Sequence, residues 1–219
     1  MTFIRGSRAR TERKTVISDE EFEEMLLKAD GILDSFFRLR AKALLCVLRL
    51  NGKRREEIAL LERSDFKIEE SFLNITFTLL KKRKGTVISK QSIKSIPLKD
   101  PLTKPILEYL EYLDSLKPKP RFFLPRVKSF FGEGYKILSE EHVSGRQVFN
   151  IVRSLSSSVW CHLFRETVAS DVIKQDSSII GAFKVQRRLD LEDHRTGLRY
   201  LVRFSSDIIE RELEKEERE

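Results

Sequence analysis

Cysteine, methionine and tryptophan are scarce in this chain of 219 residues, which has two, two and one of them respectively. With only Cys46 and Cys161, the chain cannot have the disulfide framework of a small secreted protein. No uncharged apolar run reaches the roughly 18 residues that a membrane-spanning helix requires. The opening residues, MTFIRGSRARTERK, have no apolar stretch typical of a secretory signal. We therefore expect a protein of a reducing, cytoplasmic compartment that has no contact with a membrane.

Glycine and proline are also infrequent, with nine and six residues, which excludes collagen-like and low-complexity chains. Hydrophobic residues make up 40% and charged residues 35% of the sequence, a composition that favours a folded and highly charged domain. At about 150 residues per domain, the length predicts one or two domains with a sizeable core. The abundance of lysine and glutamate is typical of thermophile proteins.

The formal net charge of the chain is +8, and it is unevenly distributed. Residues 1–14 carry five basic groups and one acidic group, whereas residues 207–219 carry seven acidic and three basic groups. Without that acidic tail, the remaining residues have a net charge of +12. A soluble basic protein without a polyanionic partner stays open from charge alone, but such an excess favours nucleic acid as the partner.

The hydrophobic pattern predicts a mainly α fold with a small antiparallel β-sheet and a single core. A first helix is expected over residues 18–29, where Ser18 and Glu21 have the spacing of a capping box. A second, buried helix is expected over residues 33–50 and should end at Gly52. Further helices are expected from about Arg55, at about 100–116, 145–155, 160–175, 178–189 and 194–205, and in the charged tail.

The strands of one hairpin are predicted at residues 71–80 and 86–98, which are rich in β-branched side chains. The residues between them, KKRKG, form a strongly basic turn. Loops are expected at residues 116–126, which contain several prolines, and at residues 130–134. The sequence contains no internal repeat.

Three segments contain residues suited to chemistry on phosphates. The first, NGKRREEIALLERSDF (51–66), places an arginine and a glutamate after a glycine. The second, HLFRETVAS (162–170), contains His162 and Arg165, which share a helix face because they are three residues apart. The third, LDLEDHRTGLRY (189–200), ends in a tyrosine on a late helix.

The order of these segments resembles the catalytic domain of the tyrosine recombinase (phage integrase) family. That family has Gly-x-Arg-x-x-Glu, a lysine on a β-hairpin, His-x-x-Arg and a tyrosine near the C-terminus. The resemblance covers residues 18–205 and implies a basic N-terminal arm at 1–17 and a charged tail helix at 206–219. It also implies a mobile-element or viral role in prokaryotes, an archaeal member being one candidate, and association with the nucleoid.

The resemblance implies a site-specific DNA recombinase that cleaves and rejoins DNA through a 3′-phosphotyrosine, without a metal or another cofactor. Its catalytic residues would be Arg54, Lys84, His162, Arg165 and Tyr200. Two guanidiniums provide planar donors for the phosphate oxygens, and the tyrosine is the nucleophile. The lysine would protonate the leaving 5′-oxygen, and the histidine would assist proton transfer or hold the phosphate.

Some residues have secondary or unsettled roles. Glu57 is expected to orient Arg54, and Lys82 is the second candidate for the acid. Nine residues before Tyr200, where the family has His or Trp, this chain has Leu191, so His194 is considered as a substitute. DNA contacts are expected from Lys81, Lys82, Arg83 and Lys90.

The expected partners are double-stranded DNA and further copies of the chain, up to a tetramer on DNA, with the tail docked on a neighbouring protomer. The family's helical core-binding domain is not found in this sequence. Two alternatives stay open: a catalytically impaired relative that only binds DNA, and a DNA-relaxing enzyme similar to type IB topoisomerases.

Overall fold

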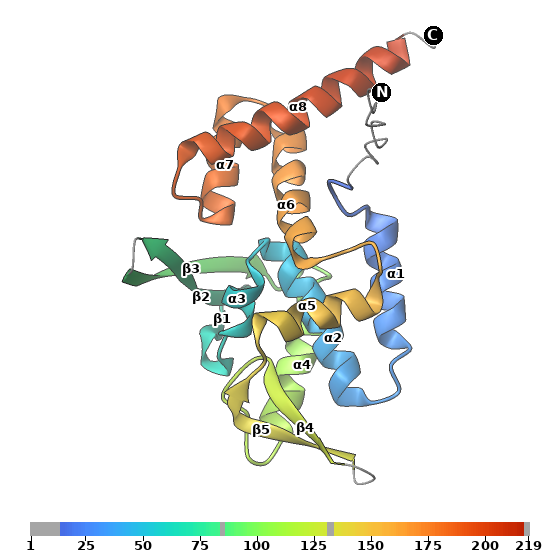
Figure 1. Cartoon of the computed structure of the whole chain (residues 1–219), viewed down its shortest axis with the longest axis vertical. Helices are drawn as coiled ribbons and strands as arrows, with labels where there is room; N and C mark the ends of the chain where they lie inside the picture. The colour runs from blue at the N-terminus through green and yellow to red at the C-terminus, as the bar shows by residue number, and fades with distance from the viewer. Residues whose placement is uncertain (1–13, 84–85, 131–133, 217–219) are drawn as a thin grey trace, which may run out of the picture.

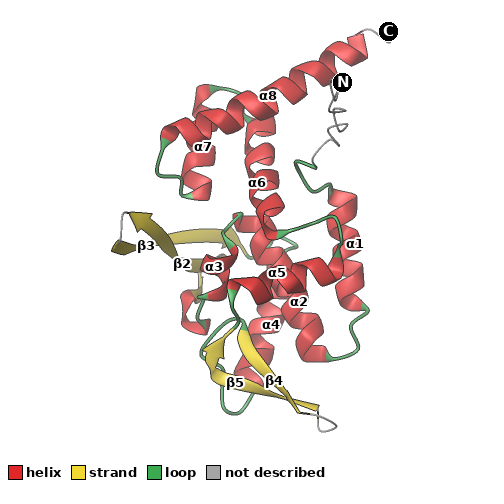
Figure 2. Ribbon diagram, in the orientation of Figure 1, coloured by secondary structure: helices red, strands yellow, loops and turns green. Residues whose placement is uncertain are grey.

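The computed structural model describes residues 14–83, 86–130 and 134–216. Its helices are α1 (Asp19–Asp30), α2 (Ser35–Asn51), α3 (Arg55–Ala59), α4 (Thr103–Ser115), α5 (Gly145–Leu155), α6 (Cys161–Gln175), α7 (Ile179–Leu189) and α8 (His194–Glu216), with a 3₁₀ turn at Arg63–Asp65. Its strands are β1 (Phe66–Glu69), β2 (Phe72–Arg83), β3 (Thr86–Pro97), β4 (Pro125–Phe130) and β5 (Gly134–His142). The predicted fold class, mainly α with small antiparallel sheets, is confirmed (Figure 2).

The first helices begin where their capping residues predict. The hydroxyl of Ser18 accepts a hydrogen bond from the backbone N–H of Glu21 at 3.2 Å, and Asp34 caps α2 in the same way. The carboxylate of Glu21 does not return to Ser18, because it binds Lys14 and Ser158 instead. The expected capping box is therefore half formed.

Strands β1, β2 and β3 form one antiparallel sheet in that order (Figure 1). The pairing of β2 with β3 runs from Phe72 opposite Pro97 to Arg83 opposite Thr86. Leu73, Ile75, Phe77 and Leu79 alternate along β2 and are buried, as expected for a strand with one face on the core. The hairpin was predicted from the sequence, and the strand β1 was not. The basic turn was predicted at residues 81–85, but Lys81, Lys82 and Arg83 belong to β2, and residues 84–85 lie outside the described part of the chain.

A second hairpin, β4 with β5, was not predicted from the sequence. The loop predicted at 116–126 is present between α4 and β4 as far as residue 124, and the loop predicted at 130–134 falls where β4 ends and β5 begins. Phe130 is the last residue of β4 and Gly134 the first of β5, while residues 131–133 lie outside the described part of the chain. Most side chains of both strands are exposed or half-buried. The sequence therefore has no alternation of apolar and polar residues by which these strands could be recognised.

The core has two parts, which corrects the expectation of a single one. The larger cluster extends from Ile17 to Phe164. The smaller cluster joins α6, α7 and α8 through Val168, Ile173, Val185 and Phe204, among others. Helix α6 connects the two parts, as Figure 2 shows. Helix α8 continues past residue 205, so the predicted helices at 194–205 and in the tail are one helix. None of the helices in the described residues is long and apolar enough to cross a membrane.

Candidate active site

Arg54 lies at the junction between α2 and α3. Gly52 ends α2 in a left-handed conformation (φ 57°), and a Cβ there would come within 2.7 Å of Leu189. Glu57, only 1% exposed, accepts hydrogen bonds from the backbone N–H of Arg54 at 3.0 Å and from its guanidinium at 3.2 Å. The side chain of Arg54 is still 52% exposed. Glu57 therefore fixes Arg54 and leaves part of its guanidinium open to a ligand.

Arg165 lies on α6 and is 4% exposed. Its guanidinium donates one hydrogen bond to the carbonyl of Gly52 at 2.9 Å and another to the carbonyl of Leu189 at 2.7 Å. Burial lowers the pKa of Arg165, and the charge of Arg54 lowers it further. An arginine stays protonated nevertheless, so two positive charges are held close together. An anion that bound between them would relieve their repulsion.

A buried ion pair, between Lys53 and Asp190, lies beside the two arginines. The side chain of Lys53 is fully buried, and its ammonium lies 4.6 Å from the centre of the Phe77 ring. Asp190 also accepts hydrogen bonds from Ser92 at 2.8 Å and from Lys94 at 3.1 Å. Burial lowers the pKa of Lys53 to about 8, although the bond to Asp190 opposes this shift. The pair joins the α2–α3 junction to the end of α7, and the bonds from Ser92 and Lys94 join Asp190 to β3.

His162 lies one turn before Arg165 on α6, and its side chain is 61% exposed. Its Nε2 is 3.0 Å from a carboxylate oxygen of Glu166, whose other oxygen accepts a hydrogen bond from Arg203 at 2.8 Å. Glu166 therefore orients the imidazole and links α6 to α8.

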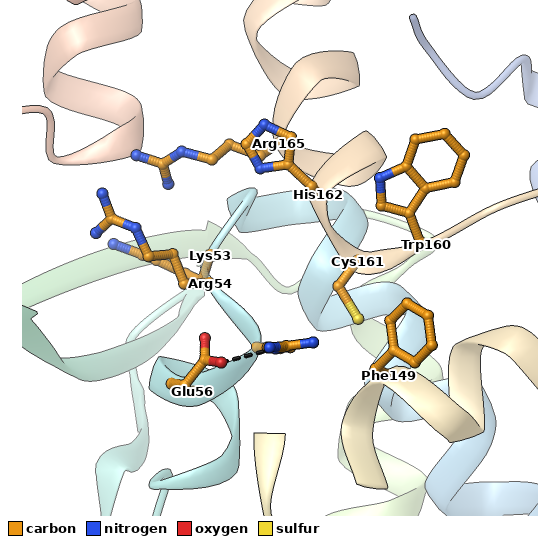
Figure 3. Close-up of a pocket in the computed structure, with 9 residues that line it drawn as sticks. Lys53, Arg54, Glu56, Phe149, Trp160, Cys161, His162 and Arg165 are labelled. Atoms are coloured by element: carbon orange, nitrogen blue, oxygen red, sulfur yellow. Dashed lines mark hydrogen bonds and ion pairs between the residues drawn. The ribbon is translucent and has the colours of Figure 1, made fainter. Parts of the chain in front are cut away.

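Arg54, His162 and Arg165 line one cleft of about 270 Å³. In Figure 3 the two arginines and the histidine lie around a common space. The remaining lining residues are Lys53, Arg55, Glu56, Phe149, Trp160 and Cys161. Burial raises the pKa of Cys161 to about 11, so its thiol is protonated at neutral pH. The cleft is therefore a cationic site with one aromatic wall.

Tyr200 lies on α8 next to this cleft but does not line it. Its ring stacks on Phe204, with 6.1 Å between the ring centres and 8° between the planes. Burial and the charge of Glu166 raise the pKa of Tyr200, whereas the charge of Arg165 and a hydrogen bond with its side chain oppose the shift. The hydroxyl is therefore in contact with one of the two arginines.

Of the other predicted residues, those with described side chains do not line the cleft. His194 is the first residue of α8 and is exposed, with Asp193 3.7 Å from its Nδ1. Leu191 packs against the smaller core cluster, and Lys90 is exposed on β3. Lys84 lies outside the described residues, and of Lys81, Lys82 and Arg83 only the backbone in β2 is described.

Sequence reasoning missed Lys53 and Asp190 in particular. Lys53 stands in the basic run KRR, where nothing distinguishes a buried lysine from an exposed one. Asp190 follows a helix and occupies a left-handed position (φ 50°), which aspartate tolerates better than most residues. The described residues contain no group of three or more His, Cys, Asp or Glu side chains that could hold a metal ion.

Solved structures with a similar fold are tyrosine recombinases. The XerH site-specific recombinase bound to a palindromic difH substrate, in a post-cleavage complex, has a TM-score of 0.65 and 17% identity over 92% of this chain and 53% of its own. The XerA recombinase has a TM-score of 0.60 and 19% identity, covering 90% of this chain and 61% of its own. The Tn1549 transposon integrase in complex with transposon right end DNA has a TM-score of 0.53 and 14% identity, covering 92% of this chain and 67% of its own.

These likenesses establish the fold. The chain has the fold of the tyrosine recombinase catalytic domain, as its motifs predicted, and it spans about half the length of the XerH chain. No protein-family model matches the sequence, and a comparison with curated proteins finds no match.

Proposed function

We propose that this chain is a site-specific DNA recombinase that cleaves and rejoins DNA through a 3′-phosphotyrosine intermediate. The observation that carries this proposal is the meeting of Arg54 with His162 and Arg165 in one cleft. These residues come from segments more than a hundred positions apart in the chain. The contact between Tyr200 and Arg165 adds a nucleophile at the edge of the same site.

In the proposed reaction, the phenolic oxygen of Tyr200 attacks the scissile phosphorus and loses its proton to His162 or to solvent. The bond from phosphorus to the 5′-oxygen breaks, and Lys84 donates a proton to that oxygen. Arg54 and Arg165 bind the non-bridging oxygens, whose negative charge increases in the transition state; such donors typically contribute about 10²–10³ in rate each. Attack by a 5′-hydroxyl on the phosphotyrosine reverses these steps and joins the strands.

Double-stranded DNA is the proposed partner, bound largely through the basic body of the chain and through Lys81, Lys82, Arg83 and Lys90. We also propose that several copies assemble on DNA, up to a tetramer, with the end of α8 docked on a neighbour. The backbone of α8 continues to Glu216, twelve residues beyond Phe204, which is buried in the smaller cluster. This length supports a role for the helix end outside its own domain.

A catalytically impaired DNA-binding protein is the second candidate. It is favoured by Leu191, which takes the place of the family's His or Trp and packs against the smaller core cluster. A hydrogen-bond donor to the phosphate would then be absent at that position.

Covalent trapping separates the two functions. The full chain is incubated with a library of randomised duplexes, each with a nick a few nucleotides 3′ of the candidate scissile phosphate. The short fragment that carries the leaving 5′-hydroxyl then diffuses away and cannot reverse the reaction. The recombinase forms a denaturant-resistant protein–DNA adduct, which sequencing then maps. Tyr200→Phe must abolish the adduct and keep DNA binding. DNA binding by the wild-type chain without any adduct would favour the impaired relative.

A further inference from the structure

The wall of the cleft beyond the two arginines is aromatic, which phosphate binding alone does not require. Phe149 and Trp160 lie on the side of the cleft away from the two arginines (Figure 3), and Arg55 and Glu56 also line the cleft. We propose that this wall is a subsite for a nucleobase adjacent to the phosphate that Arg54 and Arg165 bind. The inference rests on the proposed function, because it assumes that the phosphate belongs to a DNA strand.

The two aromatic side chains are suited to stacking. Both are half-buried and pack against the larger core cluster, so their position is fixed while part of each ring is open to the cleft. No residue in the described part of the chain makes a hydrogen bond with the indole N–H of Trp160, which in Figure 3 faces His162. Because every base has a π-face, stacking on such side chains binds a base of any sequence.

Positive charge surrounds the same wall. The guanidinium carbons of Arg146 and Arg55 lie 5.1 and 5.9 Å from the centre of the Phe149 ring. With Arg54 and Arg165 in the adjoining part of the cleft, the site combines cations for a backbone with an apolar surface for a base. That combination matches a nucleotide better than a free phosphate or an apolar ligand.

Glu56 adds a polar acceptor that a phosphate site would not contain. One carboxylate oxygen accepts a hydrogen bond from Arg55 at 2.6 Å, and no other side chain in the described residues donates to the carboxylate. Gly145 allows this position, because a Cβ there would come within 3.1 Å of the carboxylate. A carboxylate accepts hydrogen bonds from exocyclic amino groups. We therefore expect cytosine to be preferred over thymine.

Trp160 is the single tryptophan of the chain, so its fluorescence reports on this wall alone. The full chain is titrated at low salt with d(CCC), d(TTT), a trimer of abasic deoxyribose phosphates and inorganic phosphate. Stacking on an aromatic side chain changes affinity by about fivefold or more per base. We expect d(CCC) to quench Trp160 and to bind at least fivefold more tightly than the abasic trimer, with d(TTT) between them. Equal affinity and quenching for d(CCC) and the abasic trimer would overturn the proposal and leave the aromatic residues as packing.

Three variants test which residues of the subsite bind the base. Phe149→Leu keeps the fluorophore and should lower affinity for d(CCC) severalfold without changing that of the abasic trimer. Glu56→Gln should remove the preference for cytosine, because an amide both donates and accepts. The matched control is Phe130→Leu, which changes an exposed phenylalanine that also lies near a cation, Lys128, on β4; it should change nothing. A Phe149→Leu variant that binds every probe as the wild type does would contradict the subsite.

The covalent-trapping experiment distinguishes a failure of the nucleobase subsite from a failure of the proposed recombinase function. Discrimination between d(CCC) and the abasic trimer without any adduct would contradict the recombinase function and support the subsite as part of a DNA-binding protein. An adduct at Tyr200 without discrimination among the trimers would support the function and reject the subsite.

Discussion

Lys53 and Asp190 form a buried ion pair, and the carbonyls of the residues just before them, Gly52 and Leu189, both accept hydrogen bonds from Arg165. Residues 52–53 and residues 189–190, which are far apart in the sequence, are thus held together both by the ion pair and by Arg165. The ion pair also reaches β3 through Lys94. We therefore expect the position of Arg165 to depend on the Lys53–Asp190 pair, of which Lys53 also lines the cleft.

Lys53→Met tests this dependence. Methionine can retain the packing on Phe77, but Asp190 loses its closest partner. Removing one partner of a buried pair costs about 3–5 kcal/mol, and we expect the lower end because Lys94 and Ser92 still bind Asp190. Urea denaturation measures this loss, and adduct formation should fall along with it.

The double variant Lys53→Met, Asp190→Asn is the control. Asparagine tolerates the left-handed backbone of residue 190, and its side-chain oxygen can still accept hydrogen bonds from Ser92 and Lys94, although Lys94 loses its charged partner. We expect most of the stability and of the adduct formation to return. A double variant as unstable as Lys53→Met alone would show that the pairing is not the reason for the loss.

The low pKa of Lys53 predicts a pH dependence of stability. Its pKa is about 8 in the folded chain and about 10.4 in an unfolded one. Between these values the unfolded state binds more protons, so this group makes stability rise with pH from about 8 to 10. The free energy of unfolding of the wild type should therefore increase relative to that of Lys53→Met over this range. A constant difference between the two proteins would contradict the shifted pKa.

Arg54 and Arg165 should respond differently to lysine. Arg54→Lys keeps a positive charge beside Glu57 and should leave stability almost unchanged, while adduct formation falls about 10²-fold because the planar donor pair is lost. Arg165→Lys cannot satisfy the carbonyls of Gly52 and Leu189 together. An unsatisfied buried carbonyl costs about 1–3 kcal/mol, so this variant should lose both stability and activity.

Arg126→Lys is the matched control for both arginine variants, because Arg126 is 56% exposed and pairs with Glu141 away from the cleft. It should change neither denaturation nor adduct formation. Equal destabilisation by Arg54→Lys and Arg165→Lys would contradict the structural role assigned to Arg165.

Local signals predicted much of the fold. Helix α5 begins and ends where the sequence indicated, since Ser144 caps it and its apolar residues recur on one face. The hairpin β4–β5 was not predictable, because its strands are mostly exposed and lack an apolar alternation. The division of the core was not predictable either. The start of α6 packs in the larger cluster and its later residues pack in the smaller one, and this depends on contacts with segments that are distant in the sequence.

The candidate site was predictable where a motif carried it. Arg54, His162 and Arg165 were identified from spacing and order, and the structure places all three on one cleft. The residues that support them, such as Lys53 and Glu166, depend on tertiary contacts between segments, for which a single sequence has no local signal.

The raised pKa of Tyr200 predicts how cleavage depends on pH. At pH 7–9 the tyrosine is almost entirely a neutral phenol, because burial raises its pKa above the ordinary value near 10. Adduct formation limited by the phenolate should therefore increase up to tenfold per pH unit in this range. Tyr200→Phe should keep the stacking on Phe204 and form no adduct at any pH. An adduct that persists in this variant would contradict the mechanism.

Lys84 is the first candidate for the acid because of its position beside Gly85 in the basic turn, and Lys82 is the second. Pairing of β2 with β3 reaches Arg83 and Thr86, and Lys84 follows directly outside the described residues. If Lys84 protonates the leaving 5′-oxygen, Lys84→Ala should slow adduct formation on ordinary DNA, and a 5′-bridging phosphorothioate should restore much of the rate, because a thiolate leaves without a proton. Arg165→Ala should show no such rescue, since its defect is the loss of charge stabilisation. Rescue of Lys82→Ala in place of Lys84→Ala would transfer the role of the acid to Lys82.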